Sequence, residues 1–252
     1  MAEVTIIIPI TEFATDKEKE YFTRAVKSAA DAARILVVGS PAALEAAKEV
    51  GEGFDTLENL GDTSYPAQVN LGVDNVTTEF FSVLEFDDEI TPIWKKNVDI
   101  HVESDTLSTF GFLPLTTAVD DESKETFGYI NEAFWASSFS DEVGALDLES
   151  VQNYISVNVS GGLFRTEEFK ALGKLKASMK VVYWYEFLLR ALYKGKRIYV
   201  IPKVGCHHTV NRKGGLTAAN AEKISEKELA WWIDLSGKEY FFPNDRNKQY
   251  EE

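Results

Sequence analysis

Short apolar runs alternate with helix-like segments through the first part of the chain. Val4–Ile10 and Arg34–Gly39 are rich in β-branched and aliphatic residues, as strands buried on both faces of a parallel sheet are. Between them, Thr15–Glu18 has the spacing of a capping box, and apolar residues then recur at helical intervals. Ser40–Pro41 is typical of a helix start, with proline in the first turn. This order predicts a doubly wound α/β domain with right-handed crossovers.

The same alternation continues with less regularity. We expect a weak strand at Phe54–Glu58, a helix at Thr63–Asn75, a strand at Phe80–Phe86, a helix at Ile93–Val102 and a strand at Thr106–Leu115. From 118 to 158 aromatic and acidic residues mix without a clear period. Such a stretch inside a compact domain indicates either a functional insertion or a set of strands that the pattern does not resolve.

Periodicity returns after residue 158. Thr166 is predicted to cap a short helix, Met179–Tyr193 to form a longer one, and Lys196–Ile201 to form a strand that ends at Pro202. A last helix is expected at Ala221–Ile233. The sequence therefore predicts one domain over residues 1–217, with a helix and tail at 218–252 packed on it.

Four acidic residues follow the strand predicted at Phe80–Phe86: Glu85, Asp87, Asp88 and Glu89. In an open α/β sheet, ligands bind at the carboxyl ends of the strands. Neighbouring carboxylates cannot all remain ionised cheaply without a cation, and hard oxygen ligands suit Mg²⁺ or Mn²⁺. With 41 acidic residues in the chain, a solvated acidic loop is the alternative interpretation.

Composition narrows the function classes. The formal net charge of −15 argues against broad binding of nucleic acid by a basic surface. The sequence has neither an apolar run of about 18 residues nor a secretory leader, so we expect no membrane span. Cys206 is the single cysteine and cannot form an internal disulfide. These features together predict a cytoplasmic protein.

Several short motifs, taken in order, resemble those of family 2 type glycosyltransferases with the GT-A fold. They are Ile6–Pro9, Gln68–Asn70 with Gly72, Glu85–Asp88, Gly161–Arg165, Tyr185–Arg190 with Gly195, and His207–His208. The resemblance extends from Val4 to about Gly215. It implies a Rossmann-like, mixed but mostly parallel central sheet flanked by helices, with residues 118–158 as an insertion on the acceptor side.

The resemblance also implies a reaction and a set of site residues. The expected reaction moves a sugar, with inversion, from a nucleotide-diphosphate sugar (UDP-sugar favoured) to a hydroxyl of a glycan, a small molecule or a modified nucleic acid. Mn²⁺ or Mg²⁺ would be held by Asp87, Asp88 and His208. The donor would contact Pro9, Thr11, Glu12, Gln68, Asn70, Glu85, Asp87, Gly162 and Arg212, with Lys213 also near phosphate. Asp88 and Glu186 would be the catalytic residues.

The general base departs from the family pattern. The acid pair expected before Leu188–Arg190 is replaced by Tyr183–Trp184, and Glu186, one turn later, is the substitute candidate. An i,i+4 ion pair between Glu186 and Arg190 is the alternative. Gly39–Ser40 stands where acids usually end the second strand, and Val69 stands where an arginine is usual. A non-catalytic nucleotide- or sugar-binding protein of this fold therefore remains the alternative function.

Two further points limit the candidates. Adjacent residues on a strand point to opposite faces, so at most one of His207 and His208 is expected to reach the site. A nucleotidyltransferase usually has a Gly-rich, Lys-bearing loop after the first strand, and Thr11–Ala14 has none.

Overall fold

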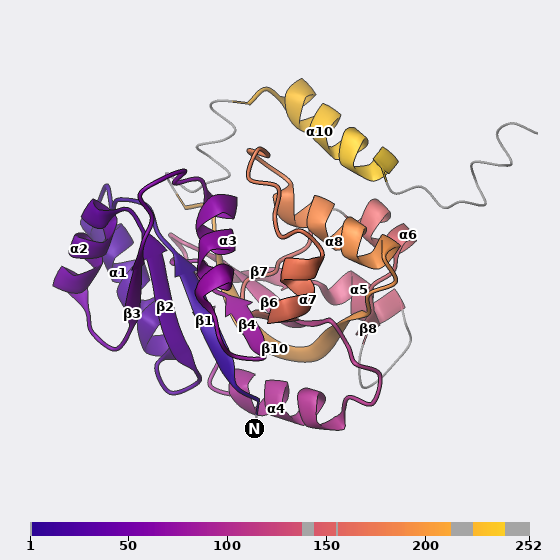
Figure 1. Ribbon diagram of the computed structural model, residues 1–252, viewed down its shortest axis with the longest axis horizontal. Coiled ribbons are helices and arrows are strands. Elements are labelled where there is room, and N and C mark those ends of the chain that lie inside the picture. Colours follow the sequence, from indigo (N-terminus) through magenta and orange to yellow (C-terminus); the bar gives the residue numbers. More distant parts are fainter. Residues whose placement is uncertain (1, 138–143, 155, 213–223, 240–252) are drawn as a thin grey trace, which may run out of the picture.

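The structure, a computed structural model, describes residues 2–137, 144–154, 156–212 and 224–239. Its centre is a ten-stranded sheet in the order β3-β2-β1-β4-β9-β6-β10-β5, with β7 beside β6 and β8 beside β10 (Figure 1). The strands are β1 Val4–Pro9, β2 Arg34–Gly39, β3 Asp55–Glu58, β4 Phe80–Val83, β5 Glu89–Ile90, β6 Gly111–Asp120, β7 Thr126–Ile130, β8 Gly144–Ala145, β9 Gly162–Arg165 and β10 Ile198–Val210.

The sheet is mixed and mostly parallel. Strands β1 to β4, β6 and β10 run in one direction, and β5, β7, β8 and β9 run in the other. The helices are α1 Asp16–Ala29, α2 Pro41–Val50, α3 Tyr65–Asn75, α4 Trp94–Ser104, α5 Glu132–Ser137, α6 Leu148–Asn153, α7 Thr166–Ala171, α8 Tyr183–Tyr193 and α10 Glu226–Glu239. Lys213 and the start of the helix expected at Ala221 lie outside the described residues.

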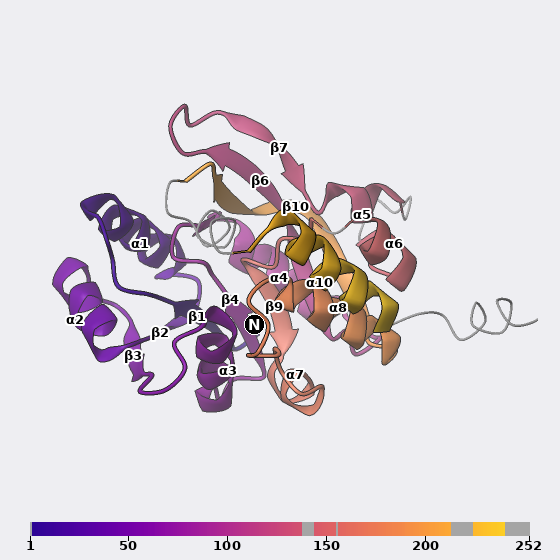
Figure 2. The ribbon, with the colours of Figure 1, turned by 90° about the horizontal axis from the view of Figure 1, so that it is seen from above.

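Helices cover both faces of the sheet because the central strands are apolar on both sides. In β1, Ile7 belongs to a core shared with α3, α7 and α8, whereas Ile6 and Ile8 belong to a second core shared with α1, α2 and α4. Alternate residues of a strand point to opposite faces, so one unbroken apolar run supplies both cores. Helix α10 packs against α8 on the outer side of the layer formed by α3, α7 and α8, as both views show (Figures 1 and 2).

The predicted helix starts are confirmed where the capping chemistry was explicit. Thr15 and Glu18 form the capping box of α1, and the Ser40 hydroxyl accepts a hydrogen bond from the Ala43 N–H at the start of α2. The helix predicted from Met179 begins only at Tyr183, since Val182 has a left-handed backbone with φ of 53°. Helix α7 begins at Thr166 itself, so the cap position belongs to Arg165.

Three strand predictions need correction. Strand β4 ends at Val83, so the acidic residues lie in the turn after it. Strand β6 begins at Gly111 and continues to Asp120, taking in the first residues of the irregular 118–158 stretch. Strand β10 does not end at Pro202: register shifts between Ile201 and Cys206 accommodate the missing N–H, and the pairing with β6 resumes.

The described part of 118–158 contains the end of β6, then β7, α5, β8 and α6. The hydrophobic pattern of the sequence does not resolve these elements. No helix in the described ranges combines the length and the apolar character needed to cross a bilayer.

Close packing of α3 on the sheet yields a stability prediction. A Cβ on Gly72 would lie 2.8 Å from Ile7 Cγ2 and 3.2 Å from Val38 Cγ2, both on buried strands. Overpacking of this kind costs typically ~1–3 kcal/mol, more than the ~1 kcal/mol that alanine gains over glycine in a helix. Gly72→Ala should therefore lower the free energy of unfolding, measured in urea.

The control is Gly237→Ala in α10, where an added Cβ would meet only the Tyr185 hydroxyl at 3.7 Å. Its helix propensity gain should raise the free energy of unfolding by up to ~1 kcal/mol. Equal effects of the two substitutions would contradict the packing of α3 on β1 and β2.

Candidate functional site

The acidic residues form a tight turn at the carboxyl end of β4. The Asp88 N–H donates to the Glu85 carbonyl at 2.9 Å, which closes the turn, and the Glu85 N–H donates to the Ser160 hydroxyl at 3.1 Å. Asp88 is completely buried, and Asp87 is 7% exposed. The turn therefore holds the carboxylates of Asp87 and Asp88 inside the protein, contrary to the solvated-loop interpretation.

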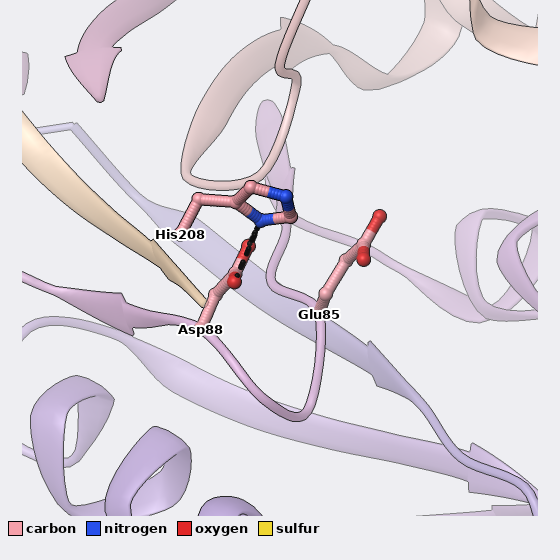
Figure 3. Close-up of side chains that lie close together, drawn as sticks. All are labelled: Glu85, Asp88 and His208. Carbon is pink, nitrogen blue, oxygen red and sulfur yellow. Dashed lines mark hydrogen bonds and ion pairs between the residues drawn. The ribbon is translucent and has the colours of Figure 1, made fainter. Parts of the chain in front are cut away.

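The far end of β10 supplies the partner of Asp88. His208 Nδ1 lies 2.9 Å from Asp88 Oδ1, and the Thr209 N–H donates to the same oxygen at 3.1 Å (Figure 3). The Thr209 hydroxyl also donates to the Asp87 carbonyl at 2.6 Å. His207 is exposed on the opposite side of the strand, where its Nδ1 lies 2.5 Å from the Thr117 hydroxyl. One histidine of the pair reaches the turn, in keeping with strand geometry.

Asp87 is paired with a different cation. Arg212 Nε donates to Asp87 Oδ2 at 2.6 Å, and Arg212 Nη1 lies 3.0 Å from Glu18 Oε1. The guanidinium also lies over the rings of Tyr21 and Phe86, 5.8 and 4.9 Å from their centroids. Arg212 is thus a buried bridge between the turn and α1, with both carboxylate partners already in place.

Burial and charge shift the pKa values of the turn. Burial raises the pKa of Glu85 to about 8, with further contributions from Asp88 and Asp87. Burial, followed by the charge of Asp88, also raises the pKa of Asp87, although Arg212 opposes the change. Burial alone would lower the pKa of His208, but the charge and hydrogen bond of Asp88 outweigh it and raise that pKa to about 9. The cluster consists of several acids balanced by one imidazole and one guanidinium.

Three of these residues could hold a divalent ion. One ligand atom from each of Glu85, Asp88 and His208 lies within 4.8 Å of the others, and all three converge on one side of the turn (Figure 3). Two carboxylates and an imidazole are a donor set suited to Mn²⁺, and to Mg²⁺ with water or phosphate oxygens added. The metal set expected from the sequence contained Asp87. Glu85 belongs to the group that converges here, whereas Asp87 is paired with Arg212.

A cavity of about 510 Å³ adjoins this cluster. Glu85 and His208 line it on one side, and the start of α8, the 156–159 segment and the start of α10 form the other walls. The volume falls in the range of roughly 300–1,000 Å³ typical of small-molecule sites. The turn and the cavity together form the candidate site.

Other residues expected to contact a nucleotide have structural partners. Gln68 Oε1 accepts from the Ile10 N–H at 3.1 Å, and Gln68 Nε2 donates to the Thr63 carbonyl, so this side chain joins the end of β1 to the start of α3. Asn70 exchanges two hydrogen bonds with the backbone of Leu175. Both side-chain amides are therefore engaged with the protein backbone.

The remaining nucleotide candidates divide into two groups. Pro9 is the buried last residue of β1, and Thr11 and Glu12, just after it, are exposed. Gly162 lies in β9, where a Cβ would come within 2.8 Å of both a Leu113 methyl and the Val159 carbonyl. The close approach that this glycine permits is therefore with protein atoms.

Glu186 lies away from the cavity lining. It is 1% exposed, its two carboxylate oxygens each lie 2.9 Å from an Arg190 nitrogen, and Lys176 Nζ is 2.9 Å from Oε1. Arg190 also donates to the Leu172 and Lys174 carbonyls, which anchors the loop before α8. These contacts favour the ion-pair interpretation of Glu186 over a role as general base.

Comparisons with known proteins bear on the fold. No protein-family model matches the sequence, and a search of curated proteins also finds no match. Among solved structures, S. aureus TarS 1-349 in complex with UDP-GlcNAc superposes with a TM-score of 0.65 at 13% identity, covering 86% of this chain and 61% of that one. The complex of TarS 1-349 with UDP gives a TM-score of 0.62 at 14% identity, with 82% and 60% covered.

The chain has a GT-A fold. It spans about 60% of the length of the TarS 1-349 chains it matches, and 37% of a longer TarS chain. At this identity the likeness establishes the GT-A architecture, and the site must be argued from the residues described above.

Several site residues escape sequence reasoning. Thr209 and Glu18 were not singled out, although both contact the polar groups of the acidic turn or its arginine. The one available signal is at Thr209 and Val210, which are both β-branched and so favour a strand beyond Pro202. Glu18 already had a capping role, so its second partner had no local signature.

Glu186 yields a prediction that separates its two interpretations. Glu186→Gln keeps the side-chain shape but leaves Arg190 and Lys176 without their buried carboxylate, which should cost on the order of 3 kcal/mol in the free energy of unfolding. Glu167→Gln is the matched control, because Glu167 pairs with Lys170 on the surface at 84% side-chain exposure. Exposed pairs contribute about 0–1 kcal/mol. An unchanged stability in Glu186→Gln would contradict the ion-pair assignment.

Proposed function

We propose that the protein is a metal-dependent glycosyltransferase that moves a sugar from a nucleotide-diphosphate sugar, with UDP-sugar favoured, to an acceptor hydroxyl with inversion. The observation that carries the proposal is the convergence of Glu85, Asp88 and His208 at the carboxyl end of β4, beside a cavity of about 510 Å³. Ligands of open α/β sheets bind at this edge.

The comparisons support the choice of donor. The neighbours that share the GT-A fold include TarS structures in complex with UDP-GlcNAc and with UDP. The exposed residues after β1, Thr11 and Glu12, lie at the same sheet edge and are the proposed contacts of the nucleoside. Pro9, Gln68, Asn70 and Gly162 stay proposed donor contacts, although the side chains of Gln68 and Asn70 also hydrogen-bond to the protein backbone.

Glu85, Asp88 and His208 are the proposed ligands of Mn²⁺ or Mg²⁺. When bound, such an ion supplies positive charge that stabilises the leaving diphosphate. Arg212 pairs with Asp87 and with Glu18 of α1, so we assign it the positioning of the turn. Thr209 holds the turn from the other side through Asp87 and Asp88.

The proposed transfer is a displacement at the anomeric carbon of the donor sugar. The acceptor oxygen forms a bond to the anomeric carbon, and the bond from that carbon to the diphosphate breaks, with its electron pair leaving on UDP. The hydroxyl proton is released to water. Among the described residues that line the cavity, Glu85 is the one carboxylate, and it belongs to the ion-binding group. Glu186 is engaged by Arg190 and Lys176.

This placement of Glu186 favours a second candidate, a nucleotide-sugar-binding protein without turnover. The two functions separate in one assay with UDP-GlcNAc and Mn²⁺. The glycosyltransferase assignment predicts slow release of UDP by hydrolysis even without an acceptor. Unaltered UDP-GlcNAc after prolonged incubation, with saturable binding, would support the binding protein instead.

The ion and diphosphate assignment predicts metal-dependent binding of UDP. Titration calorimetry should detect binding of UDP to the wild-type protein with Mn²⁺, and Asp88→Asn should weaken it at least about tenfold, which corresponds to ~1.4 kcal/mol. Asp74→Asn is the control, because Asp74 is at the other end of α3 in a surface pair with Lys174. Equal affinity with and without Mn²⁺, or equal loss in both variants, would contradict the assignment.

A further inference from the structure

The cavity beside the ion-binding group is walled mainly by aliphatic side chains. They come from five separate segments and include Ile130, Val157, Val159, Val182, Val210 and Leu229. The described lining contains neither lysine nor arginine, and its acidic and imidazole members, Glu85 and His208, both belong to the ion-binding group. Apart from Ser156, Asn158, Tyr183 and Trp184, the other described lining residues are aliphatic.

The wall at 156–159 is preformed. Asn131 Nδ2 donates to the Asn158 carbonyl at 2.8 Å and to the Pro114 carbonyl at 2.9 Å, and Asn131 Oδ1 accepts from the Asn158 N–H at 3.1 Å. One side chain therefore replaces the backbone partners of an extended segment. A fixed wall lowers the ordering cost of binding, so apolar burial there converts efficiently into affinity.

One polar group in this wall lacks a hydrogen-bond partner among the described residues. The side-chain oxygen of Asn158 accepts from the Ser160 N–H at 2.7 Å, whereas its Nδ2 is buried and has no hydrogen-bond partner among the described residues. A buried donor without a partner is costly and is commonly explained by a ligand or water. The 156–159 wall thus contains one buried donor that the described residues leave unsatisfied.

The opposite wall carries backbone strain. Val182 has φ of 53°, a backbone conformation that β-branched residues rarely adopt. Holding a residue in such a conformation costs about 1–3 kcal/mol of folding free energy. Its side chain lines the cavity at the start of α8, next to Tyr183 and Trp184. Glycine would remove the strain, yet the chain places a valine there, which adds apolar surface to the cavity.

We propose that the acceptor is an alcohol with an extended apolar body, which lies in this cavity with its hydroxyl end toward Glu85 and His208. The inference rests on the proposed transferase function, since it assigns the acceptor side of the same site. It favours an apolar acceptor over a glycan, because a glycan presents many hydroxyls and the described walls offer it few polar partners. The described lining also offers no lysine or arginine to phosphate groups, which equally disfavours a nucleic acid.

The test uses two probes with the same head group and different tails, hexyl and methyl β-D-glucopyranoside. Titration calorimetry in the presence of UDP and Mn²⁺ should give at least about tenfold tighter binding of the hexyl compound. Cellobiose serves as the glycan probe and should bind no better than the methyl compound. Equal binding of the two glucosides, or preferred binding of cellobiose, would overturn the proposal.

Two substitutions in α10 test whether hexyl glucoside binds in this cavity. Leu229→Asp places a charge on the cavity wall and should reduce hexyl glucoside affinity at least about fivefold. Leu235→Asp is the matched control, since Leu235 is 41% exposed against 39% for Leu229 but does not line the cavity. Equal loss in both variants would overturn the assignment of this cavity.

Val182→Gly adds a variant that should fold well, because glycine tolerates the left-handed backbone. It should retain or gain thermal stability while it weakens hexyl glucoside binding. Unchanged hexyl glucoside affinity would contradict the role of this wall. Failure of UDP to bind overturns the transferase function and the acceptor role with it, whereas UDP binding without a preference for the hexyl tail overturns the acceptor class alone.

Discussion

The parallel pairing of β10 with β6 is the constraint on which the site depends. Strand β10 passes Pro202 with two register shifts and then pairs with β6 as far as Val210 and Asp120. This continuation carries His208 and Thr209 to Asp88, about 120 residues earlier in the chain. Without it, the acidic turn after β4 would have no imidazole partner, and Asp88 would be a buried carboxylate with an uncompensated desolvation cost.

The acidic turn is stabilised by partners that come from distant parts of the chain. Asp88 is satisfied by His208 and Thr209, and Asp87 by Arg212, whose second partner is Glu18 on α1. Each buried charge thus has a partner from a distant part of the chain. Glu85 and His208 also line the cavity, so the pair that satisfies Asp88 lies at the edge of the candidate binding site.

Sequence reasoning succeeded where the determining signal was local. The runs at Val4 and Arg34 and the helix cap at Ser40 are set by neighbouring residues, and the strand and helix bounds there match closely. The acidic turn was also located, because its position after an apolar strand is a local feature. The i,i+4 spacing of Glu186 and Arg190 likewise indicated their ion pair.

The remainder depends on contacts that the sequence does not display. A proline usually ends a strand, and only the neighbouring β6 makes the bulge in β10 acceptable. The pairing of Asp87 with Arg212 joins residues 125 apart, so neither residue alone reveals that the carboxylate is occupied. The apolar cavity is assembled from short segments of β7, β10, α8 and α10, none of which has a binding motif of its own.

The most direct test of the account is whether His208 coordinates the ion at the acidic turn. Electron spin echo spectroscopy of Mn²⁺ with UDP, on protein labelled with ¹⁵N-histidine, reports nitrogen coupled to the metal. The account predicts a coupling that is lost in His208→Gln and kept in His207→Gln, because the neighbouring histidine faces the other side of β10. Absence of nitrogen coupling, or its persistence in His208→Gln, would contradict the assignment of this turn as a cation and diphosphate site.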